Sequence, residues 1–283
     1  MKKVVLAFSG GLDTSYCAIY LAKEMGLEVH AALANTGGFS AEELARIEKR
    51  AYALGVKSYV ALDVTQDYYQ HAIKYMIFGN VLKNSTYPIS VSSERISQAT
   101  AIARYAREIG AEYLCHGSTG AGNDQVRFDM IFNIVAPEIE VIALIREKRL
   151  SREEEIEYLR SHGVDFDFKK AEYSINQGIW GTSVGGKETL TSSETLPEEA
   201  YPSQLKESKS RRITLTFEKG EFVGLDGKRF DDRIAAIQAL QAVAAPYAIG
   251  RDMHVGDTII GIKGRVGFEA AAPMIIIKAH HML

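Results

Sequence analysis

Ala7-Phe8-Ser9-Gly10-Gly11-Leu12-Asp13-Thr14-Ser15 joins a short apolar run, residues 4–8, to a segment with apolar side chains at helical spacing, residues 14–23. A buried strand that enters a glycine turn and then a helix is typical of the ligand-binding edge of an open α/β sheet. Glycines let backbone N–H groups approach an anion, and the helix N-terminus adds a partial positive charge. The Asp13 carboxylate would repel a phosphate unless Mg²⁺ lay between them. The stretch therefore predicts a loop that binds phosphate groups together with Mg²⁺.

The segments on both sides of this loop continue the alternation of strand and helix. Apolar runs predict strands over residues 28–34, 58–64, 113–116 and 140–144. Helical spacing predicts a helix from the capping box at Ser40 to residue 53, and further helices over residues 66–78, 94–109 and 155–161. Two capping boxes, Ser40 to Glu43 and Ser151 to Glu154, mark helix starts. Strands linked by helices imply a parallel sheet with right-handed crossovers. We therefore expect an α/β fold in which residues 1–164 form a doubly wound parallel sheet that binds a nucleotide.

The rest of the chain, residues 165–283, has a different pattern. Short strands are predicted over residues 213–217, 222–225 and 228–230 around the hairpin signal Asp226-Gly227, and further strands over residues 259–263 and 274–277. An alanine-rich helix is predicted over residues 231–244, and the polar stretch 197–209 is expected to be a surface loop or arm. This pattern favours a second α+β domain with antiparallel pairing.

Composition excludes several classes of protein. The 283 residues carry 33 basic and 36 acidic side chains, a net charge of −3, which argues against a protein held mainly by nucleic-acid phosphates. Cys17 and Cys115 are the only cysteines, so there is no disulfide framework, which fits a reducing cytosol. No apolar run reaches the ~18 residues of a membrane span, and the one near the N-terminus is shorter than a signal peptide requires. We therefore expect a cytoplasmic protein.

A second glycine-rich string follows the predicted strand 113–116. It reads His116-Gly117-Ser118-Thr119-Gly120-Ala121-Gly122-Asn123-Asp124-Gln125-Val126-Arg127-Phe128 and combines hydroxyl, amide, carboxylate and guanidinium groups. Such a loop at the sheet edge would face the first loop across a cleft. Two facing polar loops at one sheet edge favour an enzyme site over a simple nucleotide-binding module.

The two strings together resemble those of a known family. The first matches the Ser-Gly-Gly-x-Asp-Ser/Thr loop of enzymes that cleave ATP between its α and β phosphates, and the second matches argininosuccinate synthase. Further motifs of that family are Tyr87-Pro88-Ile89-Ser90-Val91-Ser92, with Arg95 close behind, and Tyr173-Ser174-Ile175-Asn176, followed by Ser183. The resemblance covers nearly the whole chain.

This resemblance implies a reaction. The ureido oxygen of citrulline attacks the α-phosphorus of ATP, pyrophosphate leaves, and the amine of aspartate then displaces AMP from the citrullyl-adenylate. Charge develops on phosphoryl oxygens, so backbone donors and Mg²⁺ would act by positioning and electrostatics. ATP and Mg²⁺ are the implied cofactors, and no residue is assigned as a resident metal ligand.

The resemblance also assigns the site residues, with Asp13 and Asp124 as catalytic groups. The ATP contacts it implies are Ala7, Phe8, Ser9, Gly10, Gly11, Leu12, Asp13, Thr14, Ser15, Ala34 and Gly117. The substrate contacts it implies are Tyr87, Ser92, Arg95, Thr119, Asn123, Asp124, Arg127, Ser174 and Ser183. Within this set Thr119, Asn123 and Asp124 would hold aspartate, with Asp124 on its α-ammonium. Arg127 would present a planar fork to the citrulline carboxylate.

Two positions depart from the family pattern. Phe268 stands where the family has Tyr, which removes a hydroxyl hydrogen bond of roughly 0.5–1.5 kcal/mol. Gly256 stands where the family has a Glu that is expected to balance the citrulline α-ammonium.

We consider three explanations for the missing carboxylate. Asp257 or Glu269 substitutes for it from a neighbouring position; His254 and its surroundings reshape the pocket; or the substrate is an N-acylated citrulline, whose acyl group would meet Arg251, His254 or Lys263.

The sequence also bears on two other functions, tRNA modification and regulatory ATP binding, and on the oligomeric state. A tRNA-modifying enzyme with the same ATP chemistry would commonly need paired cysteines and a basic face, and a regulatory ATP-binding module would not need so many polar ligands. Chains of the family continue past the position of Leu283 into a helical arm that locks a tetramer, so the resemblance implies a homo-oligomer, although residues 1–283 do not include this arm.

Overall fold

The computed structural model describes residues 1–120, 122–164, 173–259, 261 and 263–283. Its first part is a five-stranded parallel sheet in the order β3-β2-β1-β4-β5. The strands are β1 (Lys3–Ala7), β2 (Glu28–Asn35), β3 (Ser58–Asp63), β4 (Tyr113–His116) and β5 (Glu140–Ile142). The predicted parallel sheet and its strands are confirmed.

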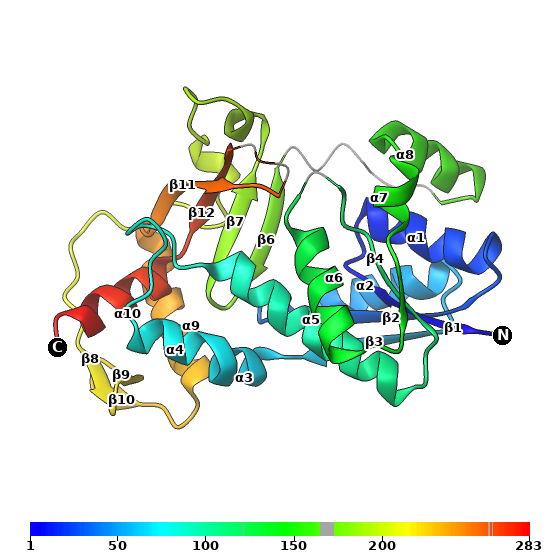
Figure 1. Cartoon of the computed structure of the whole chain (residues 1–283). Coiled ribbons are helices and arrows are strands. Elements are labelled where there is room, and N and C mark those ends of the chain that lie inside the picture. The colour runs from blue at the N-terminus through cyan, green and yellow to red at the C-terminus, as the bar shows by residue number, and fades with distance from the viewer. Residues whose placement is uncertain (121, 165–172, 260, 262) are drawn as a thin grey trace.

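Helices cover both faces of this sheet (Figure 1). Val4 and Leu6 of β1 pack toward α1 (Leu12–Lys23), α2 (Ala41–Ala53) and α8 (Arg152–Ser161), while Val5 packs toward α5 (Ser90–Glu108) and α6 (Asp124–Val135). A strand buried on both faces reads as a continuous apolar run, as residues 4–8 do. Both predicted capping boxes form. The strand order reverses between β1 and β4, which is where such sheets bind ligands.

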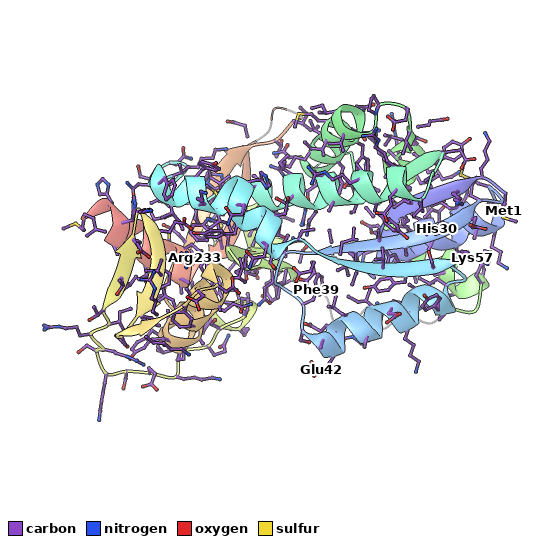
Figure 2. The ribbon with its side chains drawn as sticks, turned by 90° about the horizontal axis from the view of Figure 1, so that it is seen from below. Met1, His30, Phe39, Glu42, Lys57 and Arg233 are labelled. Atoms are coloured by element: carbon purple, nitrogen blue, oxygen red, sulfur yellow. The ribbon has the colours of Figure 1, made fainter. Side chains whose placement is uncertain are left out.

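A helical segment after β3 leaves the sheet and packs against the C-terminal part. It consists of α3 (Thr65–Tyr68), a π-helical stretch η1 (Tyr69–Ile73) and α4 (Lys74–Phe78). Tyr68 and Ile73 share a core with Trp180, Phe222 and Ile237. Figure 2 shows the arrangement from below, with Arg233 in the C-terminal part and His30 and Lys57 toward the other end of the molecule. Part of the chain before residue 164 therefore helps to build the second core.

The C-terminal part contains two antiparallel sheets. One has the order β11-β12-β7-β6, formed by β6 (Ser174–Gly178), β7 (Gly181–Gly185), β11 (Arg251–Asp257) and β12 (Lys263–Glu269). The other joins β8 (Leu215–Glu218), β9 (Glu221–Leu225) and β10 (Lys228–Arg229). Asp226 and Gly227 have φ angles of +49° and +81° between β9 and β10, so the predicted hairpin turn is confirmed. The helices are α9 (Arg233–Ala244) and α10 (Ala271–His281), with short 3₁₀ turns η3 (Lys187–Leu190), η4 (Glu198–Ala200) and η5 (Ala245–Tyr247).

Several local predictions are wrong. The strand predicted over residues 274–277 lies inside α10, because this short apolar run belongs to a helix whose Ala272 and Ile276 are buried one turn apart. The strand predicted over residues 259–263 includes residues 260 and 262, outside the described ones, and Ile259 and Gly261 belong to a turn and bend between β11 and β12. The sequence did not predict α6, because the polar string before Phe128 resembles a loop. It also did not predict α7 (Leu144–Lys148), which begins at the last residue of the strand predicted over residues 140–144. No helix in the described part of the chain is long and apolar enough to cross a membrane.

Candidate active site

The loop after β1 is held open for an anion. Gly10 has a φ of +74°, and its carbonyl accepts a 2.6 Å hydrogen bond from Arg50 Nη1. The Ser15 hydroxyl donates to the Gly11 carbonyl at 2.7 Å, and no side chain caps the first turn of α1 at Gly11. The N-terminal N–H groups of α1 are therefore free of a side-chain cap, which is the arrangement that binds phosphate.

The loop after β4 lies directly against this first loop. A Cβ added at Gly117 would be 3.0 Å from Thr14 Cγ2 and 3.3 Å from Asp13 Cβ. Ala34 is the last residue but one of β2, on the other side of β1, and its carbonyl accepts a 3.2 Å hydrogen bond from Gln98 Nε2. The structure thus brings the residues predicted to bind ATP to one edge of three neighbouring strands. Ala7 and Phe8 are buried in the two cores, so only their backbone is placed to contact a nucleotide.

Asp124, at the start of α6, is clamped between two arginines. Arg95 Nε donates to Asp124 Oδ2 at 3.0 Å, and Arg127 Nη1 donates to Asp124 Oδ1 at 2.5 Å. Arg95 also binds Asn176 Oδ1 at 2.7 Å, and Arg127 binds Ser92 Oγ at 3.1 Å. Burial acts to raise the pKa of Asp124, but the charges and hydrogen bonds of the two guanidinium groups outweigh it and leave the pKa below its usual value. Asp124 is therefore an anchored anion and a poor proton acceptor.

Tyr87 and the N-terminus of α5 form a second polar corner. The Tyr87 hydroxyl accepts hydrogen bonds from the Val91 N–H at 3.0 Å and from Ser90 Oγ at 3.2 Å. Ile89, at the N-cap of α5, supplies no side-chain cap. Together with Ser92 and Arg127, this corner has the donors that a carboxylate needs.

Asn123 connects α6 to the turn that follows β11. Its Nδ2 donates to the Asp257 carbonyl at 3.0 Å, and its Oδ1 accepts from the Ile259 N–H at 2.7 Å. A contact between this amide and a substrate therefore requires the turn to release it. Thr119, also predicted to contact substrate, is exposed in the loop after β4.

The remaining predicted contacts lie on one face of the β11-β12-β7-β6 sheet. Asn176 is opposite Ser183, Ser183 is opposite Phe268, and residues opposite each other share a face. Ser174 lies two positions before Asn176 on the same face and is exposed, whereas Ser183 is buried. The bond between Asn176 and Arg95 shows that this face is directed toward α5.

His254 occupies the position where the family pattern places a carboxylate. A Cβ added at Gly256 would lie 2.8 Å from His254 Nε2, so the ring fills the space of a side chain at 256. The ring stacks on Tyr87 with centroids 4.6 Å apart, and Phe268 packs on the same Tyr87 ring at 5.2 Å. The explanation in which His254 reshapes the pocket agrees with this geometry.

Glu269 does not substitute for the missing carboxylate. It lies on the opposite face of β12 from Phe268, and its Oε2 accepts a 2.8 Å bond from Arg251 Nε. The register of β11 also places Asp257 on the face opposite to Gly256. The substitution explanation is therefore wrong for Glu269 and unfavourable for Asp257, because neighbouring strand positions point to opposite faces. The side chain of Lys263 is outside the described part.

His116 has a structural role beneath the second loop. Its Nδ1 accepts from the Ser118 N–H at 3.2 Å and its Nε2 is 2.9 Å from Asp129 Oδ1. Arg146 binds the other oxygen of Asp129. This chain of bonds holds the glycine-rich loop at the end of β4.

Glu155 is a site residue that the sequence did not indicate. Glu153 and Glu154 are exposed, but Glu155 is buried with Leu159 on the face of α8 that packs against α1. Burial and the nearby Asp13 carboxyl group, to which it is hydrogen-bonded, raise the pKa of Glu155 to about 8, while its Oε2 has no hydrogen-bond partner. Glu155 lies four residues before the apolar Leu159, and this spacing on one helix face was the sequence signal that could have indicated its burial.

Oxygen donors in this region fit a magnesium ion that arrives with ATP. The Asp13 carboxyl group is a hard oxygen donor beside the phosphate-binding turn, which is the donor type that Mg²⁺ prefers, whereas the raised pKa of Glu155 keeps that carboxyl group protonated at neutral pH. The described residues contain no group of three or more metal-ligating side chains, so the phosphates would supply the other ligands.

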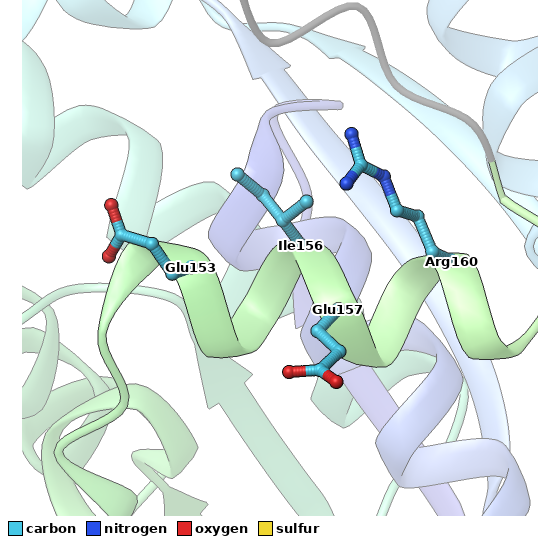
Figure 3. Close-up of a pocket in the computed structure, with 4 residues that line it drawn as sticks. All are labelled: Glu153, Ile156, Glu157 and Arg160. Atoms are coloured by element: carbon cyan, nitrogen blue, oxygen red, sulfur yellow. The ribbon is translucent and has the colours of Figure 1, made fainter.

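Two other features lie outside this site. A hollow on α8 is lined by Glu153, Ile156, Glu157 and Arg160 and contains none of the predicted site residues (Figure 3). Cys17 and Cys115 are fully buried, and a hydrogen bond of the Cys17 thiol with Cys115, together with burial, raises the pKa of Cys17. Buried thiols with a raised pKa are poor nucleophiles, which disfavours a cysteine-dependent tRNA-modifying enzyme.

Comparisons with known proteins agree with this geometry. Residues 3–165 match the family model described as the arginosuccinate synthase N-terminal HUP domain, and residues 173–283 match that of the C-terminal domain. A protein of Dictyoglomus turgidum named argininosuccinate synthase is 37% identical over all of this chain and 71% of its own length. Proteins of the same name from Xanthomonas axonopodis pv. citri and Methanocaldococcus jannaschii are 38% and 32% identical, over 100% and 99% of this chain and 69% and 71% of their own lengths. The chain belongs to the argininosuccinate synthase family.

Proposed function

We propose that this chain condenses citrulline with aspartate through a citrullyl-adenylate, forming argininosuccinate, AMP and pyrophosphate in arginine biosynthesis. The observation that carries the proposal is the meeting of three elements at one edge: the capless N-terminus of α1, the glycine loop after β4, and the Arg95–Asp124–Arg127 cluster. An adenylating ligase needs an anion site for ATP beside a polar site for a second substrate.

The ATP phosphates are assigned to the loop of residues 9–15. The N–H groups of the first turn of α1 would bind the leaving pyrophosphate, and the hydroxyls of Ser9 and Thr14, which lie 3.2 Å apart, would donate to its oxygens. Gly117 lets the second loop close to within contact of Asp13 and Thr14. Mg²⁺, when bound through Asp13 and the phosphates, would neutralise charge on the leaving group.

Citrulline is assigned to the corner between α5 and the antiparallel sheet. Arg127, Ser92 and Tyr87 would hold its carboxylate, because the guanidinium group of Arg127 and the two hydroxyl groups can donate hydrogen bonds and lie together at the N-terminus of α5. Ser174 and Ser183 would line the same pocket from the sheet face, with Arg95 fixed beneath them through Asn176.

Aspartate is assigned to Thr119, Asn123 and Asp124. The structure supports a charge-pairing role for Asp124 toward the aspartate ammonium. Its lowered pKa argues against proton abstraction by this carboxylate, since a base must have a pKa near the working pH. The ammonium would lose its proton to solvent or to the adenylate phosphate, and Asp124 would hold the amine toward the adenylate carbon.

The test is pyrophosphate release with ATP, Mg²⁺, citrulline and aspartate. The proposal predicts that pyrophosphate and AMP appear together and that sustained turnover needs both amino acids. Parallel reactions with N-acetylcitrulline and N-succinylcitrulline test the acylated alternative, which stays open because position 256 carries no side chain and Glu269 is bound to Arg251 on the opposite face. No product with any of these ureido acids would contradict the proposal, and nucleotide binding alone would indicate a regulatory module.

The proposal also includes a cellular location and an oligomeric state. Two free thiols support a location in the cytoplasm. A homotetramer is proposed from the family resemblance, and sedimentation of the chain tests it, with a monomer at micromolar concentration contradicting it.

A further inference from the structure

A buried imidazole beside the proposed citrulline pocket has no hydrogen-bond partner among the residues that the structure describes. His254 is 7% exposed, its Nδ1 is buried and unpartnered, and no hydrogen bond joins Nε2 to any residue that the structure describes. Buried polar groups in native proteins are almost always hydrogen-bonded, so an orphan ring of this kind requires an explanation. A ligand that the ring binds is one such explanation.

The ring is placed where a substrate would meet it. It stacks on Tyr87, whose hydroxyl lies at the N-terminus of α5 next to the groups assigned to the citrulline carboxylate. It also shares its sheet face with Ser183 and Asn176. The α-nitrogen of an amino acid is one carbon from its carboxylate, so a substrate held at Tyr87 and Arg127 would carry its α-nitrogen close to this ring.

The ring is uncharged at neutral pH. Burial and the nearby Lys83 ammonium lower the pKa of His254. A neutral imidazole has one nitrogen that accepts a hydrogen bond. The ring therefore offers an acceptor to an N–H donor without adding a positive charge to a pocket that already holds two arginines.

The nearby carboxylates are mostly engaged elsewhere. Asp124 is bound by two arginines, Glu94 is buried beside Arg95, and Glu269 binds Arg251 on the opposite face. Asp252 is exposed on the same face as His254, and its Oδ1 accepts from the Met253 N–H at 2.7 Å. Asp252 is therefore a competitor that a test must separate from His254.

We infer that His254 is a specificity-determining residue that accepts a hydrogen bond from the α-nitrogen of the ureido substrate. The inference rests on the proposed function, because it places the substrate carboxylate at Tyr87 and Arg127. The shared chemistry is an N–H donor one carbon from a carboxylate, which both citrulline and an N-acylated citrulline carry.

The experiment pairs a variant with a substrate analogue that lacks the α-nitrogen. Wild type, His254→Leu and His254→Gln are compared for citrulline and for 5-ureidopentanoate, with KM, inhibition constants and kcat measured by pyrophosphate release. We expect wild type to bind citrulline roughly tenfold to a hundredfold more tightly than 5-ureidopentanoate, His254→Leu to lose this preference, and His254→Gln to recover part of it. The KM for ATP should not change. Met253→Leu, on the other face of β11, is the matched control and should behave as wild type.

Each other outcome decides against the inference. Equal loss of citrulline and 5-ureidopentanoate binding in His254→Leu would show a packing role, and an unchanged preference would show that the ring does not contact the α-nitrogen. Loss of the preference in Asp252→Asn but not in His254→Leu would assign the role to Asp252. If wild type uses N-acetylcitrulline, it should bind it more tightly than 5-ureidopentanoate, which lacks the α-nitrogen. His254→Leu must lose this preference too, or the inference fails. If wild type releases no pyrophosphate with any ureido acid, the proposed function is rejected. The inference about His254, which rests on that function, is then rejected with it.

Discussion

The carboxyl edge of the parallel sheet and the face of the antiparallel sheet opposite it build two halves of one site in different ways. At the parallel edge the functional groups come from short continuous strings, residues 7–15 and 116–128, that follow β1 and β4. On the antiparallel face they come from β6, β7, β11 and β12, which lie far apart in sequence. The first half carries the residues of the family motif, and the second half carries the two departures, Gly256 and Phe268.

The difference shows which substitutions each half tolerates. A phosphate-binding turn depends on backbone geometry, such as the positive φ of Gly10 and the close approach at Gly117, so its sequence has little freedom. A pocket wall made of cross-strand neighbours depends on the combined shape of several side chains. His254 and Gly256, two positions apart on one face, can therefore change together and still form a packed wall.

The largest effect is expected where the two halves meet, at Asp124. Asp124→Asn removes the charge that compensates Arg95 and Arg127 and should lower kcat/KM for aspartate by about a hundredfold to a thousandfold, because it leaves two partly buried guanidinium charges uncompensated and removes the partner proposed for the aspartate ammonium. Steady-state kinetics with aspartate as the varied substrate measures it. Glu218→Gln, which breaks an exposed pair with Arg229, is the control. A loss of less than threefold in kcat/KM for Asp124→Asn would mean that the ion pairs of Asp124 with Arg95 and Arg127 are not needed for aspartate to react.

The next effect concerns stability beneath the parallel edge. The pKa of Glu155 is about 8 in the folded chain against an ordinary value of 4.5, so the folded state binds its proton more tightly than the unfolded state. Stability from this group is present below pH 4.5 and is lost as pH rises toward 8. Glu155→Gln, always neutral, should therefore be more stable than wild type by on the order of 4 kcal/mol at pH 8 and by about 1 kcal/mol or less at pH 5.

Denaturant unfolding of the ligand-free chain across this pH range measures the difference. Glu153→Gln, on the exposed side of α8, is the matched control and should follow wild type. A constant difference between Glu155→Gln and wild type at both pH values would show that Glu155 is ionised throughout.

A smaller effect is expected from the contact between the two loops of the parallel edge. Gly117→Ala places a methyl group 3.0 Å from Thr14 Cγ2, which should push the loops apart and raise the KM for ATP about tenfold. Gly122→Ala meets nothing within 4 Å and serves as the control in the same loop. An unchanged KM for ATP in Gly117→Ala would show that the close approach is not needed for nucleotide binding.

The smallest effect is expected on the antiparallel face. Gly256→Ala would displace the His254 ring, since the added Cβ is 2.8 Å from Nε2, and should raise the KM for citrulline a few-fold without changing that for ATP. In a His254→Ala background the same substitution should have no further effect, because the colliding ring is gone. Additive effects of the two substitutions would show that ring and residue 256 are independent. Gly185→Ala, on the same sheet with room for a methyl group, is the control.

The two halves also differ in how far the sequence predicted them. The strand-turn-helix around residues 9–15 was predictable because the pattern is local and the capping boxes at Ser40 and Ser151 signal helix starts directly. The Arg95–Asp124–Arg127 cluster was predictable only as a set of residues, since its geometry depends on the packing of α5 against α6.

Other features could not be predicted because tertiary packing decides them. The run at residues 274–277 is apolar enough for either a strand or a helix, and its burial against α9 and the second core selects the helix. Glu155 resembles its exposed neighbours in sequence, and only the packing of α8 on α1 buries it beside Asp13. The His254 ring replaces a side chain at 256 only because β11 places both on one face.

The central claim is that the ureido oxygen attacks the α-phosphorus of ATP at this edge, and an isotope experiment tests it most directly. Citrulline labelled with heavy oxygen in its ureido group is converted with ATP, Mg²⁺ and aspartate, and the AMP is analysed by mass spectrometry. The account predicts that each AMP carries one labelled oxygen and that pyrophosphate carries none. Unlabelled AMP, or label in pyrophosphate, would contradict a citrullyl-adenylate and with it the assignment of the two halves of the site.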